Sequence, residues 1–518
     1  MTAAATNDAV RPVKRGGMAE APALWLGAAC FLVHLVANAH YDVFRDELYF
    51  IVCGLHPAFG YVDQPPLIPL IAAASYKLFG TALTPLRLVP ALAMSATVAL
   101  TADLARRLGG GRFAQMLAGL CALLAGALLA NGVLLSPHCL QPLIWLACAW
   151  TVVRLVDSGD ERWWLAFGAL AGVSLESDYL IAFYLVGLAV GVVATPLRRS
   201  LTRPWIYAGA ALALALAAPN VAWQAAHGWP FLQIAGADVG AKSVGQSPVG
   251  LLFQQAVFVG PLSAPVWLAG LWLLAARPPR AELRALAIAY VVMATIFVLA
   301  HAKAYYFAPS YPTLFAAGGV AWERWLKRPA ARWVAIAVVA IPGLVGAPTA
   351  LPILPPATLV GYLRAIGYPP EASQTENMKL DALPQNYADM FGWREMAAAV
   401  SAAYRDLPPD ARAQAVFFAP NYGEAAALDI YGPALGGPPT ISAHNSYYLW
   451  GPRGASGEVV ITLARDGARF GRYYDDVHAA GRTDAAYAMP YENGLTIWVL
   501  RRPRASIADV WAALKHYD

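Results

Sequence analysis

The fold is decided within residues 21–66, APALWLGAACFLVHLVANAHYDVFRDELYFIVCGLHPAFGYVDQPP, where an apolar run meets an acidic segment. Residues 21–39 contain no Asp, Glu, Lys or Arg and are about as long as one membrane span. Carboxylates at the mouth of a membrane protein are costly to place and point to a functional site. The segment that follows the apolar run contains Arg45 and, among its acidic residues, Asp46, Glu47 and Asp63.

The composition of the whole chain is also that of a membrane protein. Of its 518 residues, 58% are hydrophobic and 13% are charged, and the mean hydropathy is +0.48. A globular domain has about 25% charged residues, so this composition predicts a polytopic α-helical membrane protein. The net charge of +5 comes from short Arg and Lys clusters between apolar runs, which argues against a nucleic-acid partner. The five cysteines have no metal-binding or redox spacing and are interpreted as apolar fillers.

Long apolar runs predict how often the chain crosses the membrane. Arg and Lys cluster in every second connection between these runs, as the positive-inside rule requires of cytoplasmic loops. We therefore expect eleven spans, near residues 21–39, 85–105, 113–134, 139–156, 162–176, 179–196, 204–221, 250–275, 284–301, 309–323 and 332–350.

This topology divides the chain into three parts. Residues 1–20 are expected in the cytoplasm, and residues 21–351 form a transmembrane domain whose first outer loop is 40–84. Within that loop, the run that follows Pro65 is short for a span and is interpreted as an interfacial or re-entrant helix. We expect a multi-pass protein of the inner (plasma) membrane, with everything after residue 351 on the periplasmic or extracytoplasmic side.

The polar tail, residues 352–518, is long enough for a soluble α/β domain with its own core. Helical patterns cover 392–405 and the stretch from Tyr422 to Tyr431. Strand-like runs are AVFFAP at 415–420, EVVITLA at 458–464 and LTIWVLRR at 495–502.

A second outer segment, HAKAYYFAPSYP at 301–312, provides cationic and aromatic side chains opposite the acidic loop. A lysine suits a phosphate, and tyrosine offers an apolar face with a donor at its edge. The alternative is a snorkelling lysine in an aromatic interface belt. Together with an acidic loop, these side chains suit a lipid-linked phosphate donor and a hydroxyl acceptor, for which a carboxylate can serve as general base. The candidates are His301, Lys303, Tyr305 and Tyr306.

Six ordered motifs carry a family resemblance: RDELYF (45–50), GYVDQPPLIPL (60–70), LRLVPAL (86–92), KAYYFAPSYP (303–312), NYGEAAALDIYG (421–432) and HNSYYLWGP (444–452). The chain resembles bacterial GT-C glycosyltransferases of the branch that contains protein O-mannosyltransferases and lipid A aminoarabinose transferases.

The resemblance implies a GT-C-like fold and transfer of a sugar, with inversion, from a polyprenyl-phosphate donor to a lipid, glycan or protein hydroxyl on the outer face. It places the acidic pair on Asp46 and Glu47, with Asp46 as base, and a second acidic position on Asp63. Donor phosphate is expected near Lys303, with Arg45, His301, Tyr305 and Tyr306 as further candidates. A divalent cation is a possible cofactor, with Glu47 and Asp63 as its ligands. Acceptor or accessory candidates are Gln64, Asn421, Tyr422, Glu424, His444, Asn445 and Trp450.

Three positions depart from the pattern of this branch. Gln64 stands where many relatives have a basic residue, and Gln141 where many have an acidic one. LESDYL at 175–180 contains Glu176 and Asp178 where a lysine is often found. A membrane transporter or lipid-linked sugar flippase is the alternative function, although most acidic residues lie in predicted loops. A membrane-anchored binding protein that acts through its tail is a third possibility.

Overall fold

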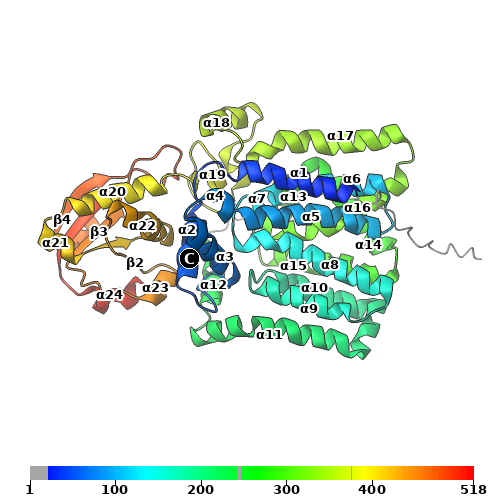
Figure 1. Ribbon diagram of the computed structural model, residues 1–518, viewed down its shortest axis with the longest axis horizontal. Coiled ribbons are helices and arrows are strands. Elements are labelled where there is room, and N and C mark those ends of the chain that lie inside the picture. The colour runs from blue at the N-terminus through cyan, green and yellow to red at the C-terminus, as the bar shows by residue number, and fades with distance from the viewer. Residues whose placement is uncertain (1–20, 242–246, 375, 518) are drawn as a thin grey trace, which may run out of the picture.

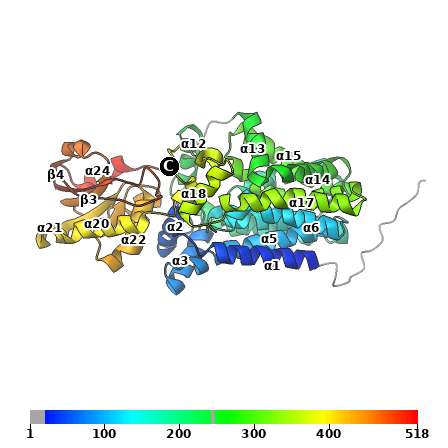
Figure 2. The same cartoon turned by 90° about the horizontal axis from the view of Figure 1, so that it is seen from above.

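The computed structural model describes residues 21–241, 247–374 and 376–517, so the expected cytoplasmic segment 1–20 lies outside the described residues. A bundle of roughly parallel helices lies at one end of the molecule and a domain built on a β-sheet at the other (Figure 1). Figure 2 shows the two parts end to end from a perpendicular direction. Helices α2 (Arg45–Leu55) and α3 (Leu67–Phe79) lie where they meet.

Each of the eleven predicted runs contains at least one helix, but the helices differ in length. Among the described residues, five helices with their attached 3-10 turns are long and apolar enough to cross a membrane. They are Leu88–Arg107 (α5), Pro137–Ser158 (η1 and α8), Pro204–Ala226 (α11), Ala281–Leu299 (η4 and α15) and Pro329–Thr349 (α17 and η6).

Two further apolar segments of the described chain are helix pairs with a sharp bend between them. In the run predicted as a span near 250–275, α13 (Pro248–Val259) and the following Pro261–Ala276 segment, which contains α14 (Ala264–Ala276), meet at 97°. Gly260 has a φ of 93° and Pro261 cannot continue the helical hydrogen bonds, so the chain turns there. Likewise α10 (Ile181–Ala194) turns by 98° into Pro196–Thr202.

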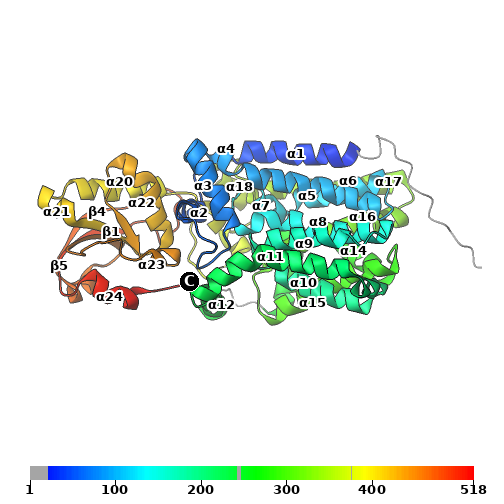
Figure 3. The ribbon, with the colours of Figure 1, turned by 60° about the horizontal axis from the view of Figure 1, so that its bottom comes forward.

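The remaining helices of the bundle are shorter. Of the apolar ones, α1 (Ala21–Ala37), α6 (Arg112–Leu124) and α9 (Trp163–Leu175) run beside the long helices (Figure 3). The others include α4 (Leu83–Leu86), α7 (Gly126–Asn131), α12 (Pro230–Ala241) and α16 (Tyr311–Trp325). The number that cross the bilayer stays a prediction.

Close helix packing in the bundle depends on glycine. A Cβ on Gly168 of α9 would lie 2.0 Å from the backbone oxygen of Gly209 of α11, so only glycine allows the two backbones to approach this closely. Small residues at helix contacts are typical of membrane proteins, where van der Waals packing holds helices together.

The segment after Pro329–Gly346 (α17) leads through α18 (Pro356–Ala365) and α19 (Gln385–Ala388) into a five-stranded sheet with strand order β2-β1-β3-β5-β4. Strands β1 and β2 and strands β1 and β3 pair in parallel, whereas β5 pairs antiparallel with β3 and β4. The bounds are β1 Ala415–Ala419, β2 Thr440–Ser442, β3 Val459–Ala464, β4 Tyr474–Arg482 and β5 Thr496–Pro503.

Sequence patterns confirmed in this part are the strands at β1, β3 and β5 and the helices α20 (Trp393–Arg405) and α22 (Tyr422–Leu435). Sequence patterns do not predict β2, β4, α21 (Pro409–Gln414), α23 (Ser446–Trp450) or α24 (Ile507–Leu514). One apolar core contains Leu48 and Ile51 of α2 together with Ala425 and Leu428 of α22. Helix α2 is therefore packed directly into the core of the C-terminal part.

Candidate functional site

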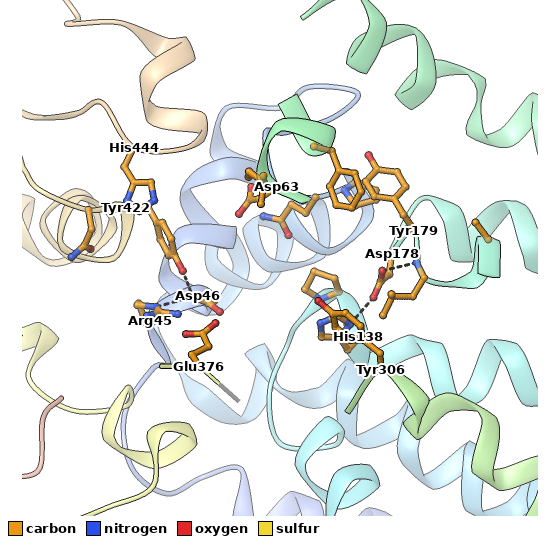
Figure 4. Close-up of a pocket in the computed structure, with 18 of the residues that line it drawn as sticks. Arg45, Asp46, Asp63, His138, Asp178, Tyr179, Tyr306, Glu376, Tyr422 and His444 are labelled. Carbon is orange, nitrogen blue, oxygen red and sulfur yellow. Dashed lines mark hydrogen bonds and ion pairs between the residues drawn. The ribbon is translucent and has the colours of Figure 1, made fainter. Parts of the chain in front are cut away.

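A cavity of about 540 Å³ lies where the two parts of the molecule meet. Figure 4 shows its labelled side chains converging from the first outer loop, the ends of bundle helices and the C-terminal part. Eight of the predicted site residues line it: Arg45, Asp46, Asp63, Gln64, Tyr306, Asn421, Tyr422 and His444. Seven are absent from its lining: Glu47, His301, Lys303, Tyr305, Glu424, Asn445 and Trp450.

Asp46 lies at the start of α2, and its side chain is 31% exposed. Its Oδ1 accepts a hydrogen bond of 2.8 Å from the Tyr422 hydroxyl and one of 3.0 Å from Arg45 Nε. In the described part of the chain, no hydrogen bond to Oδ2 is found. One carboxylate oxygen is thus fixed and the other is available to the cavity.

Arg45 is surrounded by acidic and phenolic groups. Its Nη1 donates to the Tyr491 hydroxyl at 2.7 Å and lies 3.8 Å from Asp389 Oδ2. Burial raises the pKa of Asp389 to about 6, although the Arg45 charge opposes this shift. Since Asp46 and Asp389 both contact it, the guanidinium of Arg45 has little uncompensated charge to offer a ligand.

Glu47 points away from the cavity and is fully buried. Arg87 Nη2 lies 2.8 Å from Oε2, and the backbone N–H groups of Leu135 and Phe44 donate to the carboxylate at 3.0 Å each. Adjacent residues on a helix point about 100° apart, so Asp46 faces the cavity while Glu47 ties α2 to the bundle.

Asp63 also lines the cavity. The Tyr49 hydroxyl donates to its Oδ1 at 3.0 Å and accepts from the backbone N–H of Ser446 at 3.1 Å. Gln64 beside it is buried, and its side chain also lines the cavity. The loop that holds both residues is therefore positioned by C-terminal contacts.

The 301–312 segment is only partly at the cavity. Tyr306 lines it, whereas Lys303 forms an ion pair of 3.2 Å with Glu376, which does line it. Burial on its own raises the pKa of Glu376, but the Lys303 and Arg45 charges hold it below its usual range. His301 is exposed, with a φ of 50°, and Tyr305 packs edge-on against His138.

His138 and Asp178 form a pair that the sequence motifs do not predict. His138 Nδ1 lies 2.5 Å from Asp178 Oδ2, and the backbone N–H of Leu180 donates to Asp178 Oδ1 at 2.9 Å. Both side chains line the cavity, on the side opposite Asp46 (Figure 4). Gln141 and Asp178 are departures from the family pattern, but no spacing rule connects His138 with a carboxylate forty positions further along the chain.

Several residues of the two C-terminal motifs have structural contacts. Asn421 Oδ1 accepts from the Glu424 N–H at 2.9 Å and so caps α22, and Asn421 Nδ2 donates to Glu492 at 2.8 Å. Trp450 stacks on His56 with ring centroids 4.4 Å apart, outside the cavity. Asn445 is buried, with a φ of 46°. These contacts bring the start of α22, and with it Tyr422, to Asp46.

The suggested metal ligands do not converge. Both oxygens of Glu47 are engaged by Arg87 and backbone N–H groups, away from Asp63. Across residues 21–241, 247–374 and 376–517, no group of three or more His, Cys, Asp or Glu side chains is placed to hold a metal ion. Glu47 and Asp63 therefore do not fit a shared cation, and a divalent cofactor stays a prediction.

Comparison with known proteins identifies the class of fold. The model of the dolichyl-phosphate-mannose-protein mannosyltransferase family matches residues 63–223. Among solved structures, ArnT from Cupriavidus metallidurans bound to undecaprenyl phosphate is similar, with 13% identity and a TM-score of 0.62 over 92% of this chain and 97% of that chain. Its apo state gives the same score over 93% and 98%.

The mycobacterial arabinofuranosyltransferase AftD is also similar, with 15% identity and a TM-score of 0.50 over 92% of this chain and 40% of that chain. No curated protein sequence matches significantly. The chain has the GT-C fold of membrane glycosyltransferases, so the resemblance stated from its motifs is confirmed.

Proposed function

We propose that the protein is an inverting glycosyltransferase that moves a sugar from a polyprenyl-phosphate donor to a hydroxyl acceptor, a lipid, glycan or protein, on the outer face of the membrane. The observation that carries this proposal is a cavity in which a half-fixed carboxylate, Asp46, lies across from an apolar flank. The similarity to ArnT, solved with undecaprenyl phosphate, supports this class of donor.

Asp46 is suited to act as general base. Its Oδ1 is held by Tyr422 and Arg45, so Oδ2 can accept the proton of an acceptor hydroxyl. The acceptor oxygen then attacks the anomeric carbon from the face opposite the phosphate, a new glycosidic bond forms, and the bond to the phosphate oxygen breaks. The proton remains on Asp46 and the lipid phosphate leaves with the bonding electrons.

The lining of the cavity fits an amphiphilic donor. Leu180, Ala182 and Phe183 form an apolar flank, and Ala182 and Phe183 are exposed on α10. Asp46, Asp63 and Glu376 instead provide carboxylate oxygens that accept hydrogen bonds from sugar hydroxyls. A donor with an isoprenoid chain at one end and a sugar at the other matches this change in polarity.

Transport is the weaker alternative. The described helices include two bent pairs, which transporters also use, but the carboxylates gather in one cavity at the end of the bundle. Neither the family match nor the similar structures favour it.

A transfer assay with a panel of polyprenyl-phosphate sugars tests the proposal. Wild-type protein in membranes should transfer sugar from at least one donor, and Asp46→Asn should lower that rate by about 100-fold or more, because general-base catalysis contributes at least that much. Asp475→Asn is the matched control, since Asp475 is an exposed carboxylate paired with Arg504 in the C-terminal part. Undiminished transfer by Asp46→Asn would exclude this residue as the base.

A further inference from the structure

We infer that His138, oriented by Asp178, binds the phosphate of the lipid-linked donor. This inference rests on the proposed function for the class of ligand, but it assigns the phosphate to a residue that the motifs did not select. It also moves the phosphate site away from Lys303, towards the apolar flank of the cavity.

The His138 ring is held in one orientation. Its Nδ1 is committed to Asp178 at 2.5 Å, and Asp178 is itself fixed by the Leu180 N–H. Tyr305 and Tyr306 contact the ring, with centroids 5.3 and 5.8 Å away. In the described parts of the chain, Nε2 has no hydrogen-bond partner, and the side chain is 31% exposed. In the imidazolium form, Nδ1–H is donated to Asp178 and Nε2–H remains for an anion.

The other cations near the cavity are engaged. Arg45 contacts Asp46 and Asp389, and Lys303 pairs with Glu376 at 3.2 Å. His444 Nδ1 accepts the Tyr422 N–H at 3.3 Å. A phosphate at Arg45 or Lys303 would lie beside carboxylates that already compensate the charge. Asp178 likewise compensates His138, but it engages only Nδ1 and leaves Nε2 open to the cavity.

His138 also lies at the right place between the apolar and acidic linings. Phe231 and Leu180 line the cavity near the His138–Asp178 pair, and Tyr179 packs on Phe231 with centroids 4.3 Å apart. Asp46 and Glu376 lie across from the pair (Figure 4). A phosphate on His138 would place its isoprenoid chain along the apolar flank and its sugar towards Asp46.

Lipid binding to the purified full-length chain tests this assignment, with undecaprenyl phosphate and undecaprenol as probes. His138→Gln and His138→Ala should raise the Kd for undecaprenyl phosphate about tenfold or more, since a charge-assisted hydrogen bond is worth about 1.5 kcal/mol or more. The Kd for undecaprenol should not change, because it has no phosphate. Asp178→Asn should weaken only the phosphate lipid, by a smaller factor, through loss of ring orientation.

His478→Gln is the matched control, because His478 pairs with Asp476 at 3.5 Å on the exposed strand β4. Unchanged binding in both His138 variants, or equal losses for the two lipids, would overturn the assignment. A larger loss in Lys303→Gln than in His138→Gln would return the phosphate to Lys303 and also overturn it. Failure of the proposed function has a different signature: wild type binds undecaprenyl phosphate but transfers sugar from no donor.

Discussion

The two sides of the cavity are built in different ways. The carboxylate wall, formed by Arg45, Asp46, Tyr422 and Tyr491, joins residues 376 and 446 positions apart through side-chain hydrogen bonds. The histidine wall, formed by His138, Asp178 and Tyr306, joins loops at the ends of bundle helices, and its central bond spans 40 positions. The carboxylate wall therefore depends on docking of the C-terminal part, whereas the histidine wall belongs to the bundle. This difference predicts that substitutions in one wall impair sugar transfer and substitutions in the other impair donor binding.

The strongest way to break the carboxylate wall is to release α2 from the bundle. Glu47→Gln would leave Arg87, also fully buried, without its counter-charge, and breaking a buried pair in this way costs about 3–5 kcal/mol. We expect a clear loss of thermal stability of the purified protein. Glu395→Gln, which changes an exposed carboxylate on α20, should leave the unfolding temperature unchanged. Equal stability of the two variants would show that the Glu47–Arg87 pair is not the anchor.

A smaller effect is expected from a substitution in the contact between α22 of the C-terminal part and α2. A Cβ on Gly423 would lie 2.6 Å from Arg45 Cγ and 3.1 Å from Trp393, so Gly423→Ala forces α22 away from α2. Overpacking of this kind costs about 1–3 kcal/mol. We expect a roughly tenfold loss of transfer with undecaprenyl phosphate binding retained. Gly471→Ala is the control, since its added Cβ meets no atom of the described residues within 4 Å. Loss of lipid binding in Gly423→Ala would show that the histidine wall also depends on docking of the C-terminal part.

Removal of one hydrogen bond gives a finer test. Tyr422→Phe keeps the aromatic ring but removes the 2.8 Å hydrogen bond that the Tyr422 hydroxyl donates to Asp46. Such a bond is worth about 1 kcal/mol. Transfer should fall by about fivefold, measured as kcat at saturating donor. Tyr473→Phe, on an exposed ring, should have no effect. A normal kcat in Tyr422→Phe would mean that Arg45 alone orients Asp46.

The smallest expected effect is a pH dependence of stability that comes from two buried carboxyl groups beside the carboxylate wall, Glu492 and Asp389. Burial raises the pKa of Glu492 to about 7 and of Asp389 to about 6, well above values near 4 in an unfolded chain. The folded state therefore holds more protons between about pH 4 and 7, and stability falls as pH rises through that window. The unfolding temperature should be lower at pH 8 than at pH 5.5, and Glu492→Gln should reduce this difference. An unfolding temperature that rises with pH would contradict the raised pKa values.

These two walls also show what the sequence can and cannot predict. Long apolar runs mark the bundle helices, and β1, β3 and β5 are found because their side chains are apolar and buried. The strand β4, YDDVHAAGR, escapes because it is a largely exposed edge with no apolar alternation, and β2 has only three residues.

The site residues likewise can be predicted where the signal is local and cannot where it depends on distant contacts. Motifs selected Asp46 and Tyr422 separately, but their contact depends on docking between distant segments. His138 carries no local signal, since a histidine before an apolar helix gains its meaning only when Asp178 is placed beside it. Glu47 shows the converse, because its position in the acidic motif does not reveal that it is buried against Arg87.

The most direct test of separate roles for the two walls is a kinetic comparison of Asp46→Asn with His138→Gln across donor concentrations. Asp46→Asn should lower kcat by about 100-fold with an unchanged Kd for undecaprenyl phosphate. His138→Gln should raise KM for the donor about tenfold and leave kcat at saturation within a few fold. If Asp46→Asn kept its kcat, or if His138→Gln lost kcat without any rise in KM, the division between a reacting wall and a donor-binding wall would be wrong.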